Sequence, residues 1–111
     1  MIKDPKVFLS DMLQAICKIE TYVQGLAWHD FKLDEKTQDA VIRQLMILGE
    51  AANKVDKALQ QEWQEIPWSQ LIGLRNKLVH DYAGLSPLRI WNSLQQDLPP
   101  LQRVLQQLLQ L

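Results

Sequence analysis

The chain has 111 residues, 47% of them hydrophobic and 23% charged. These proportions are typical of a soluble globular domain and exclude a disordered chain. Twelve Lys and Arg residues balance thirteen Asp and Glu residues, for a formal net charge of −1. A uniformly basic protein that coats nucleic acid is therefore excluded, although a local basic patch is not. The 19 Leu and 14 Gln residues favour helices, because unbranched side chains lose little rotamer freedom there.

Cysteine and histidine are scarce. The lone Cys17 cannot form a disulfide within the chain, and the two histidines belong to no known metal-binding pattern, so we expect no metal and no cofactor. The first five residues lack the apolar region of a signal peptide, and no apolar run is long enough to span a membrane. We therefore expect one cytoplasmic domain, residues 1–111, without a membrane association.

The first predicted helix covers residues 5–27, where apolar residues recur at three- and four-residue steps. Asp4 followed by Pro5 resembles an N-cap with proline in the first turn. Gly25 and the aromatic-polar stretch 28–31 should end this helix. A second helix is predicted over residues 35–56.

The later predicted helices start at polar residues and prolines. Asp34 is the expected N-cap of the helix at 35–56, and residues 57–66 suit only a short helical segment. Pro67 should open a third helix over residues 67–80, since the residue before proline avoids the helical region.

Ser86 and Pro87 form a second N-cap pair, and a fourth helix should begin there. Pro99 and Pro100 must kink or break it, because proline lacks the backbone N–H. Asp97 is the expected cap of the restarted segment. The prediction is an all-α, up-and-down bundle of four main helices plus a short helical segment, with a proline-kinked last helix.

Residues 74–82 concentrate polar functional groups at the end of the third helix: Arg75, Asn76, His80 and Tyr82. On an ideal helix, Arg75 and His80 are ~140° apart around the axis. They converge only if the helix ends or bends near His80, or if a second copy of the chain supplies the other set.

These residue types suit cleavage of a phosphodiester without a metal ion. Histidine can take a proton from a 2′-hydroxyl or deliver one to a leaving oxygen. The fork of donors on Arg75 can bind a phosphate whose charge grows in the transition state, and Asn76 can hold either the phosphate or the imidazole tautomer. The spacing also fits a simpler interpretation, with Arg75 in a salt bridge, His80 as a C-cap and Tyr82 in the core.

The Arg75-x4-His80-x-Tyr82 pattern resembles the motif of HepT-like toxins in the HEPN superfamily. Further similarity extends over nearly the whole chain, at residues 11–13, 39–43, 48–53 and 66–68, at Asn76 and Trp91, and at residues 97–99.

The resemblance implies a dimeric helical bundle that places two copies of the motif in one cleft. It further implies a metal-independent endoribonuclease toxin of a type VII-like toxin–antitoxin system, with RNA as substrate. Arg75 and His80 would be catalytic, and Asn76 would support them. The antitoxin partner would be an MntA-like minimal nucleotidyltransferase that transfers AMP to Tyr82, within a possible higher hetero-oligomer.

Other polar residues fit either a functional or a structural role. Arg43 and Glu50 lie seven residues apart on one helix face, which suits an ion pair, or a Glu50 that orients Arg75. Lys77 and Arg89 are candidate RNA contacts or ordinary surface cations.

The aromatic residues and the other histidine are weaker candidates. Trp63, Trp68 and Trp91 can stack on bases or pack in the core or a dimer interface. His29 is expected to be a loop or packing residue.

Two alternatives to the enzyme stay open. One is a non-catalytic helical module that binds RNA, a nucleotide or a protein partner through the same cleft. The other is a purely structural bundle that oligomerises.

Overall fold

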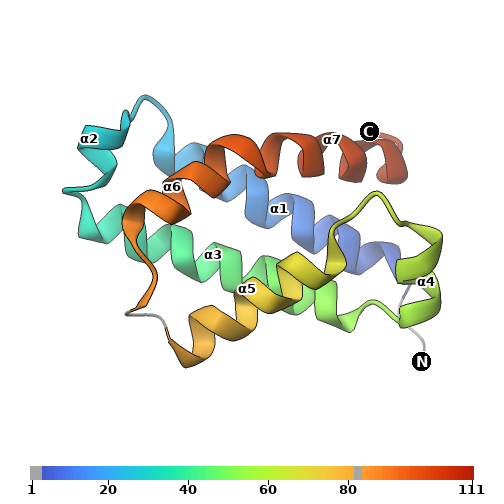
Figure 1. Cartoon of the computed structure of the whole chain (residues 1–111). Coiled ribbons are helices and arrows are strands. Elements are labelled where there is room, and N and C mark those ends of the chain that lie inside the picture. Colours follow the sequence, from blue (N-terminus) through green and yellow to red (C-terminus); the bar gives the residue numbers. More distant parts are fainter. Residues whose placement is uncertain (1–3, 82–83) are drawn as a thin grey trace.

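The computed structural model describes residues 4–81 and 84–111. This part of the chain is helical, with no strand. Its helices are α1 (Lys6–Val23), α2 (Trp28–Phe31), α3 (Glu35–Lys54), α4 (Lys57–Glu62), α5 (Trp68–His80), α6 (Pro87–Gln96) and α7 (Leu98–Leu109). The four long units are α1, α3, α5 and the bent pair α6–α7 (Figure 1), so the predicted all-α bundle is confirmed. None of the described helices has the length and apolar character needed to cross a membrane.

Local signals set the ends of α1. The Asp4 carboxylate accepts a hydrogen bond from the Lys6 backbone N–H at 3.0 Å, and Pro5 occupies the N-cap position. The helix ends at Val23, four residues earlier than predicted, just before Gly25 adopts a φ of +79°. Only glycine takes that conformation readily, which makes it an efficient helix terminator.

Residues 28–31, which the sequence analysis described only as the stretch that ends the first helix, form the short helix α2. The Asp30 side chain accepts a hydrogen bond from the Ala27 N–H at 2.8 Å, which supports the first turn. Phe31 is fully buried, and its ring centroid lies 5.1 Å from that of Trp91 on α6. Tertiary packing of Phe31 therefore stabilises a helix too short to persist alone.

Capping side chains start three later helices as their sequences suggest. The Asp34 carboxylate accepts from the Thr37 N–H at 3.0 Å at the start of α3, and Ser86 Oγ accepts from the Arg89 N–H at 3.2 Å at the start of α6. Asp56 caps α4 in the same way. The bounds of α3 and α5 and the start of α6 agree with the predictions within about two residues.

Asp97 does not cap α7 through its side chain, contrary to expectation. Its backbone is itself helical, with φ −97° and ψ −34°, whereas a capping residue normally has an extended backbone. Pro99 and Pro100 lie in the first turn of α7, where the N–H groups have no helical partner in any case. The proline pair therefore coincides with a change of direction between α6 and α7 without disrupting α7.

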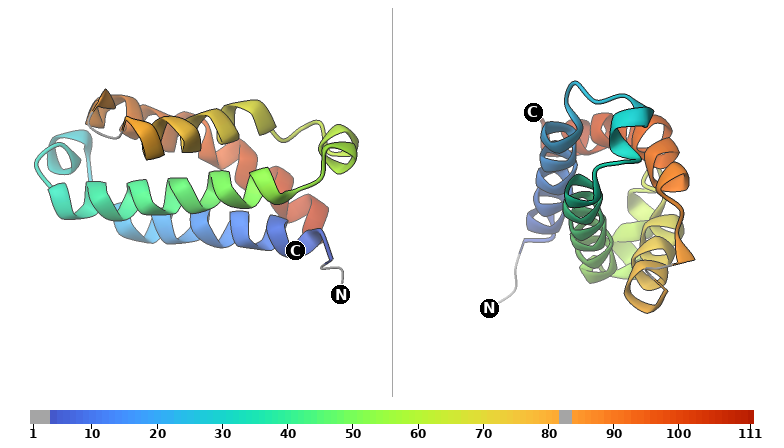
Figure 2. Two further views of the ribbon diagram at one scale, coloured as in Figure 1. Left: turned by 90° about the horizontal axis from the view of Figure 1, so that it is seen from below. Right: turned by 90° about the vertical axis from the view of Figure 1, so that its left-hand side faces the viewer.

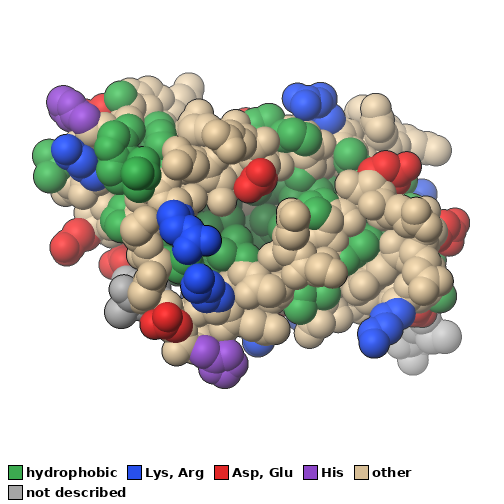
Figure 3. All heavy atoms as spheres, in the orientation of Figure 1, with side chains coloured by type: hydrophobic (Ala, Val, Ile, Leu, Met, Phe, Trp, Pro, Cys, Tyr) green, Lys and Arg blue, Asp and Glu red, His purple; other side chains and the backbone are tan. Residues whose placement is uncertain are grey.

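Helix α3 is the centre of the bundle, because it packs against α1 on one side and α5 on the other. Figure 2 shows α1 and α3 side by side, with the α6–α7 pair crossing over them. Helix α5 packs mainly against α3. A hollow of about 320 Å³ lies between α5 and α7. Figure 3 shows this hollow with hydrophobic walls. The position of Arg75 and His80 is thus determined mainly by the α3–α5 contact.

Candidate functional site

Arg75 lies on the side of α5 that packs on α3, and its guanidinium has two polar neighbours. The Nη2 atom is 3.7 Å from Oε1 of Glu50, and Nη1 donates a hydrogen bond of 3.0 Å to Oδ1 of Asn76. The Arg75 side chain is 30% exposed and that of Glu50 is 46% exposed. Two neighbours therefore hold the guanidinium while part of it still faces solvent.

The Nε atom of Arg75 has a different environment from Nη1 and Nη2. Nε is inaccessible to solvent and has no hydrogen-bond partner in the part of the chain that the structure describes. Burying an unpaired N–H is costly, so tight packing must hold the stem of this side chain. The exposed edge of the guanidinium is then the edge that carries the Nη atoms.

His80 is the last residue of α5 and is exposed. The helix stays regular up to this residue and ends at Asp81, whose φ of −147° is non-helical and whose N–H donates to the Lys77 carbonyl at 2.7 Å. Arg75 and His80 therefore keep the ~140° separation of an ideal helix, with an axial rise of about 7.5 Å. No hydrogen bond or ion pair joins them within the described chain. Tyr82 lies outside the described residues.

A groove of about 470 Å³ runs between α3 and the last turn of α5. Its apolar lining consists of Ile42, Met46, Ile47, Leu78 and Val79. Its charged lining consists of Asp39, Arg43 and Glu50. Val79 is 42% exposed, a large fraction for an apolar side chain beside a groove.

These contacts distinguish between the alternative roles considered for Glu50 and for Asn76. Glu50 pairs with Arg75 across the helices, whereas its predicted neighbour Arg43 only shares the groove with it. Asn76 contacts the Arg75 guanidinium, and the structure gives it no bond to the imidazole of His80. Both residues therefore act on the guanidinium.

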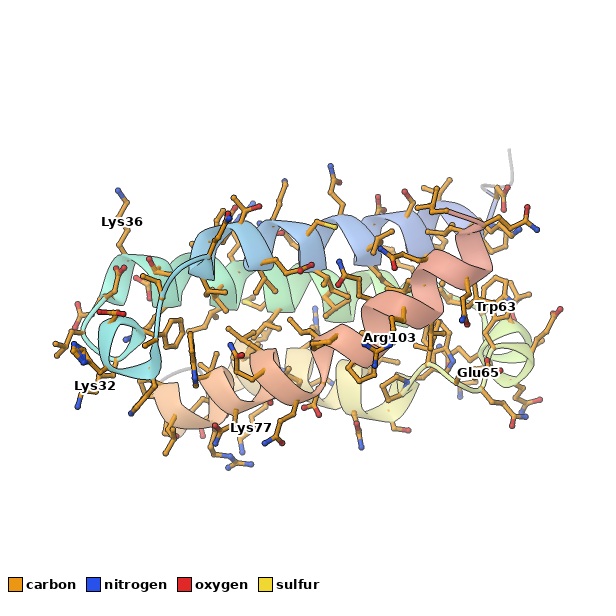
Figure 4. The ribbon with its side chains drawn as sticks, turned by 90° about the horizontal axis from the view of Figure 1, so that it is seen from above. Lys32, Lys36, Trp63, Glu65, Lys77 and Arg103 are labelled. Carbon is orange, nitrogen blue, oxygen red and sulfur yellow. The ribbon has the colours of Figure 1, made fainter. Side chains whose placement is uncertain are left out.

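Lys77 and Arg89, the candidate RNA contacts, are exposed on α5 and α6. Figure 3 shows Lys and Arg side chains gathered over the corner between these helices. In Figure 4, Lys77 lies far from the end of the bundle where Trp63 and Glu65 are found. The local surplus of positive charge thus occurs at the same end of α5 as His80.

The three candidate tryptophans pack in or against the hydrophobic core. Trp68 is buried, and its indole N–H donates to the Trp63 carbonyl at 3.1 Å. Trp91 is half-buried against Phe31, and Trp63 is also partly buried against the core. His29 is exposed on α2 and forms an ion pair with Asp30 at 3.7 Å. Within residues 4–81 and 84–111, no three His, Cys, Asp or Glu side chains gather closely enough to hold a metal ion.

Gly49 is the residue whose importance the sequence analysis missed. It is buried in the middle of α3, directly opposite Arg75. A glycine in a helix interior costs roughly 0.5–1 kcal/mol relative to alanine, and a close approach of another chain segment is one reason for its presence. The sequence offered this signal equally at Gly73, where the structure shows no such approach, so the sequence alone could not single out Gly49.

Comparisons with known proteins agree with the family resemblance noted in the sequence. The family model described as "Ribonuclease HepT-like" matches residues 12–108. A protein of Thermococcus cleftensis named "Probable ribonuclease HepT" is 37% identical over 101 residues, which cover 91% of this chain and 92% of that protein. A protein of Caldanaerobacter subterraneus subsp. tengcongensis, named as a candidate RNase, is 30% identical over 98% of this chain and 97% of its own length. No solved structure matches this chain.

Proposed function

Since this chain belongs to the HepT-like ribonuclease family of HEPN proteins, we propose that it is a metal-independent endoribonuclease. In this proposal it is the toxin of a type VII-like toxin–antitoxin pair. The family match supports RNase activity and RNA as the substrate. The observation that carries the site assignment is the Arg75 guanidinium, which is oriented by Glu50 and Asn76 with its Nη edge toward solvent.

In the proposed reaction the RNA supplies its own nucleophile. His80 takes the proton from a 2′-hydroxyl, and the oxygen attacks the adjacent phosphorus. The P–O5′ bond breaks, and the leaving 5′-oxygen receives a proton from an acid such as a second His80. Arg75 stabilises the negative charge that grows on the phosphate oxygens. The products are a 2′,3′-cyclic phosphate and a 5′-hydroxyl.

The separation of Arg75 and His80 on one helix supports a site built from two copies of the chain. A symmetric dimer brings the same patch of each copy together. The groove between α3 and α5 suits that role, because its lining combines apolar side chains with Arg43, Asp39 and Glu50. A two-fold axis there would place the apolar lining of one copy against that of the other. We propose that this face forms the homodimer.

We propose control by an antitoxin, as the family resemblance implies. An MntA-like nucleotidyltransferase would attach AMP to the hydroxyl of Tyr82, two residues after His80. The added phosphate is negative and the added base is bulky, so the modification would compete with RNA for Arg75. Lys77 and Arg89 would guide the RNA backbone into the same place.

The decisive experiment is RNA cleavage in EDTA by the wild type, His80→Ala and His29→Ala, with the intact mass of each protein measured. Both histidines are exposed, so neither variant should melt differently from the wild type. We expect the wild type and His29→Ala to cleave and His80→Ala to be inactive. Equal cleavage of RNA and of RNA with 2′-deoxy substitutions would contradict the mechanism. If an unmodified wild type binds RNA without cleaving it, the non-catalytic binding module is correct instead.

A further inference from the structure

Gly49 lies where α3 and α5 approach closely beside the candidate site. A Cβ atom at this position would lie 2.8 Å from the Leu71 carbonyl oxygen and 3.1 Å from Cγ of Arg75, and nearer still to Cβ of Arg75. The carbonyl belongs to the α5 backbone and cannot rotate away. Any side chain at position 49 would therefore displace α5 from α3 or distort the stem of Arg75.

This close approach determines the surroundings of the Arg75 side chain. Glu50, the next residue after Gly49, reaches Nη2 of Arg75 at 3.7 Å, and Asn76 accepts from Nη1. The Nε atom is inaccessible to solvent. The stem of Arg75 is thus enclosed by packing, and its outer edge alone is available to a phosphate.

The close contact with the partner helix is found at Gly49 and not at Gly73, the other glycine in α3 and α5. Gly73 lies on α5 two residues before Arg75 and is exposed, and a Cβ atom there would meet nothing within 4 Å. Gly49 is buried and enclosed, although glycine disfavours a helix interior equally at both positions. The requirement for glycine at position 49 therefore comes from the contact with α5.

We infer that Gly49 is a positioning residue for the proposed reaction: the missing side chain lets α5 approach closely enough to hold the Arg75 guanidinium against Glu50. Gly49 touches no substrate and acts through Arg75. This inference rests on the proposed ribonuclease function for its kinetic consequence, whereas the seating of Arg75 can be observed without any substrate.

The test compares Gly49→Ala with Gly73→Ala in the full-length protein, at a temperature where circular dichroism shows both to be folded. A displacement of about 1 Å at a catalytic group can reduce the rate by about 10²-fold. We expect kcat of Gly49→Ala for RNA cleavage to fall by about that factor, with KM within about threefold of the wild-type value. Gly73→Ala should keep both constants.

A spectroscopic measurement separates positioning from general destabilisation. The Nε–H proton of Arg75 is buried, so its NMR signal should exchange slowly with water in the wild type and in Gly73→Ala. In folded Gly49→Ala the signal should shift and exchange faster. A purely structural role would lower the folded fraction but leave the signal of the folded molecules unchanged, and that outcome would overturn the inference.

The failure of the inference and the failure of the proposed function are distinguishable. If the wild type does not cleave RNA, the ribonuclease proposal fails while the Nε–H signal still tests the seating of Arg75. If the wild type cleaves, Arg75→Ala does not, and folded Gly49→Ala cleaves normally, then Gly49 is not a positioning residue.

A double-mutant cycle covers the case in which Gly49→Ala melts below the temperature of the cleavage assay. In an Arg75→Gly background the clash with the Arg75 side chain is absent, so Gly49→Ala should lower Tm less than it does in the wild type. An equal loss of Tm in both backgrounds would refute the proposed contact.

Discussion

The Glu50 carboxylate on α3 lies 3.7 Å from the Arg75 guanidinium on α5, which makes it the acidic partner of the candidate catalytic arginine. Both side chains are partly exposed, at 46% and 30%. Exposed ion pairs contribute little to stability, because solvent screens them. This pair is therefore more important for the orientation of Arg75 than for the stability of the fold.

Glu50→Gln tests that role. We expect the free energy of unfolding to change by no more than about 0.5 kcal/mol. RNA cleavage should fall by about tenfold, because the guanidinium loses the charge that orients it. Glu65→Gln is the matched control, since Glu65 is exposed and lies far from Lys77 (Figure 4). Full activity of a stable Glu50→Gln protein would remove Glu50 from the site.

Val79→Glu tests the proposed dimer face. Val79 lines the groove between α3 and α5 and is 42% exposed, so the charged variant should fold. We expect analytical ultracentrifugation to show a monomer and the cleavage assay to show loss of activity, because a carboxylate in an apolar interface cannot be desolvated cheaply. Val7→Glu on α1 is the control, with a similar exposure of 39%. A monomeric Val79→Glu protein with normal cleavage would rule out a shared site.

Phe31→Ala tests the tertiary origin of α2. Phe31 is fully buried against Trp91, so the free energy of unfolding should fall by about 3–5 kcal/mol. Leu33→Ala, two residues later, should change it by no more than about 0.5 kcal/mol, because Leu33 is 77% exposed. Urea denaturation followed by circular dichroism measures both. Equal effects of the two substitutions would contradict the packing described for α2.

The Asp34 cap predicts a dependence of stability on acid. The hydrogen bond from the Thr37 hydroxyl, at 2.6 Å, and the one from the Thr37 backbone N–H hold the pKa of Asp34 below its ordinary value of 3.8. A carboxylate with a lowered pKa in the folded state stabilises the fold above the unfolded pKa, and the contribution disappears as pH falls through the folded pKa.

Melting temperatures of the wild type and Asp34→Asn at a series of pH values measure this contribution. The wild type should melt higher than Asp34→Asn at neutral pH, and the difference should shrink as the pH falls below 3.8. Asp11→Asn, an exposed carboxylate within α1, is the control and should show no comparable trend. A constant difference between wild type and Asp34→Asn down to the acid limit would mean that the charge of Asp34 does not contribute.

The sequence by itself determined the helical class and most helix boundaries. Asp34, Ser86, Gly25 and Pro67 act within a few residues of their own position, so their effect depends little on the rest of the molecule. The polar cluster from Arg75 to His80 was recognisable for the same reason, because its spacing is local.

Only the tertiary structure decided the features that depend on distant residues. Helix α2 exists because Phe31 packs on Trp91, sixty positions along the chain. The pairing of Arg75 with Glu50 and the need for glycine at position 49 arise where α5 meets α3. Helical periodicity predicts which residues share a face, but it does not predict which part of another helix that face will meet, because packing over the whole core decides this.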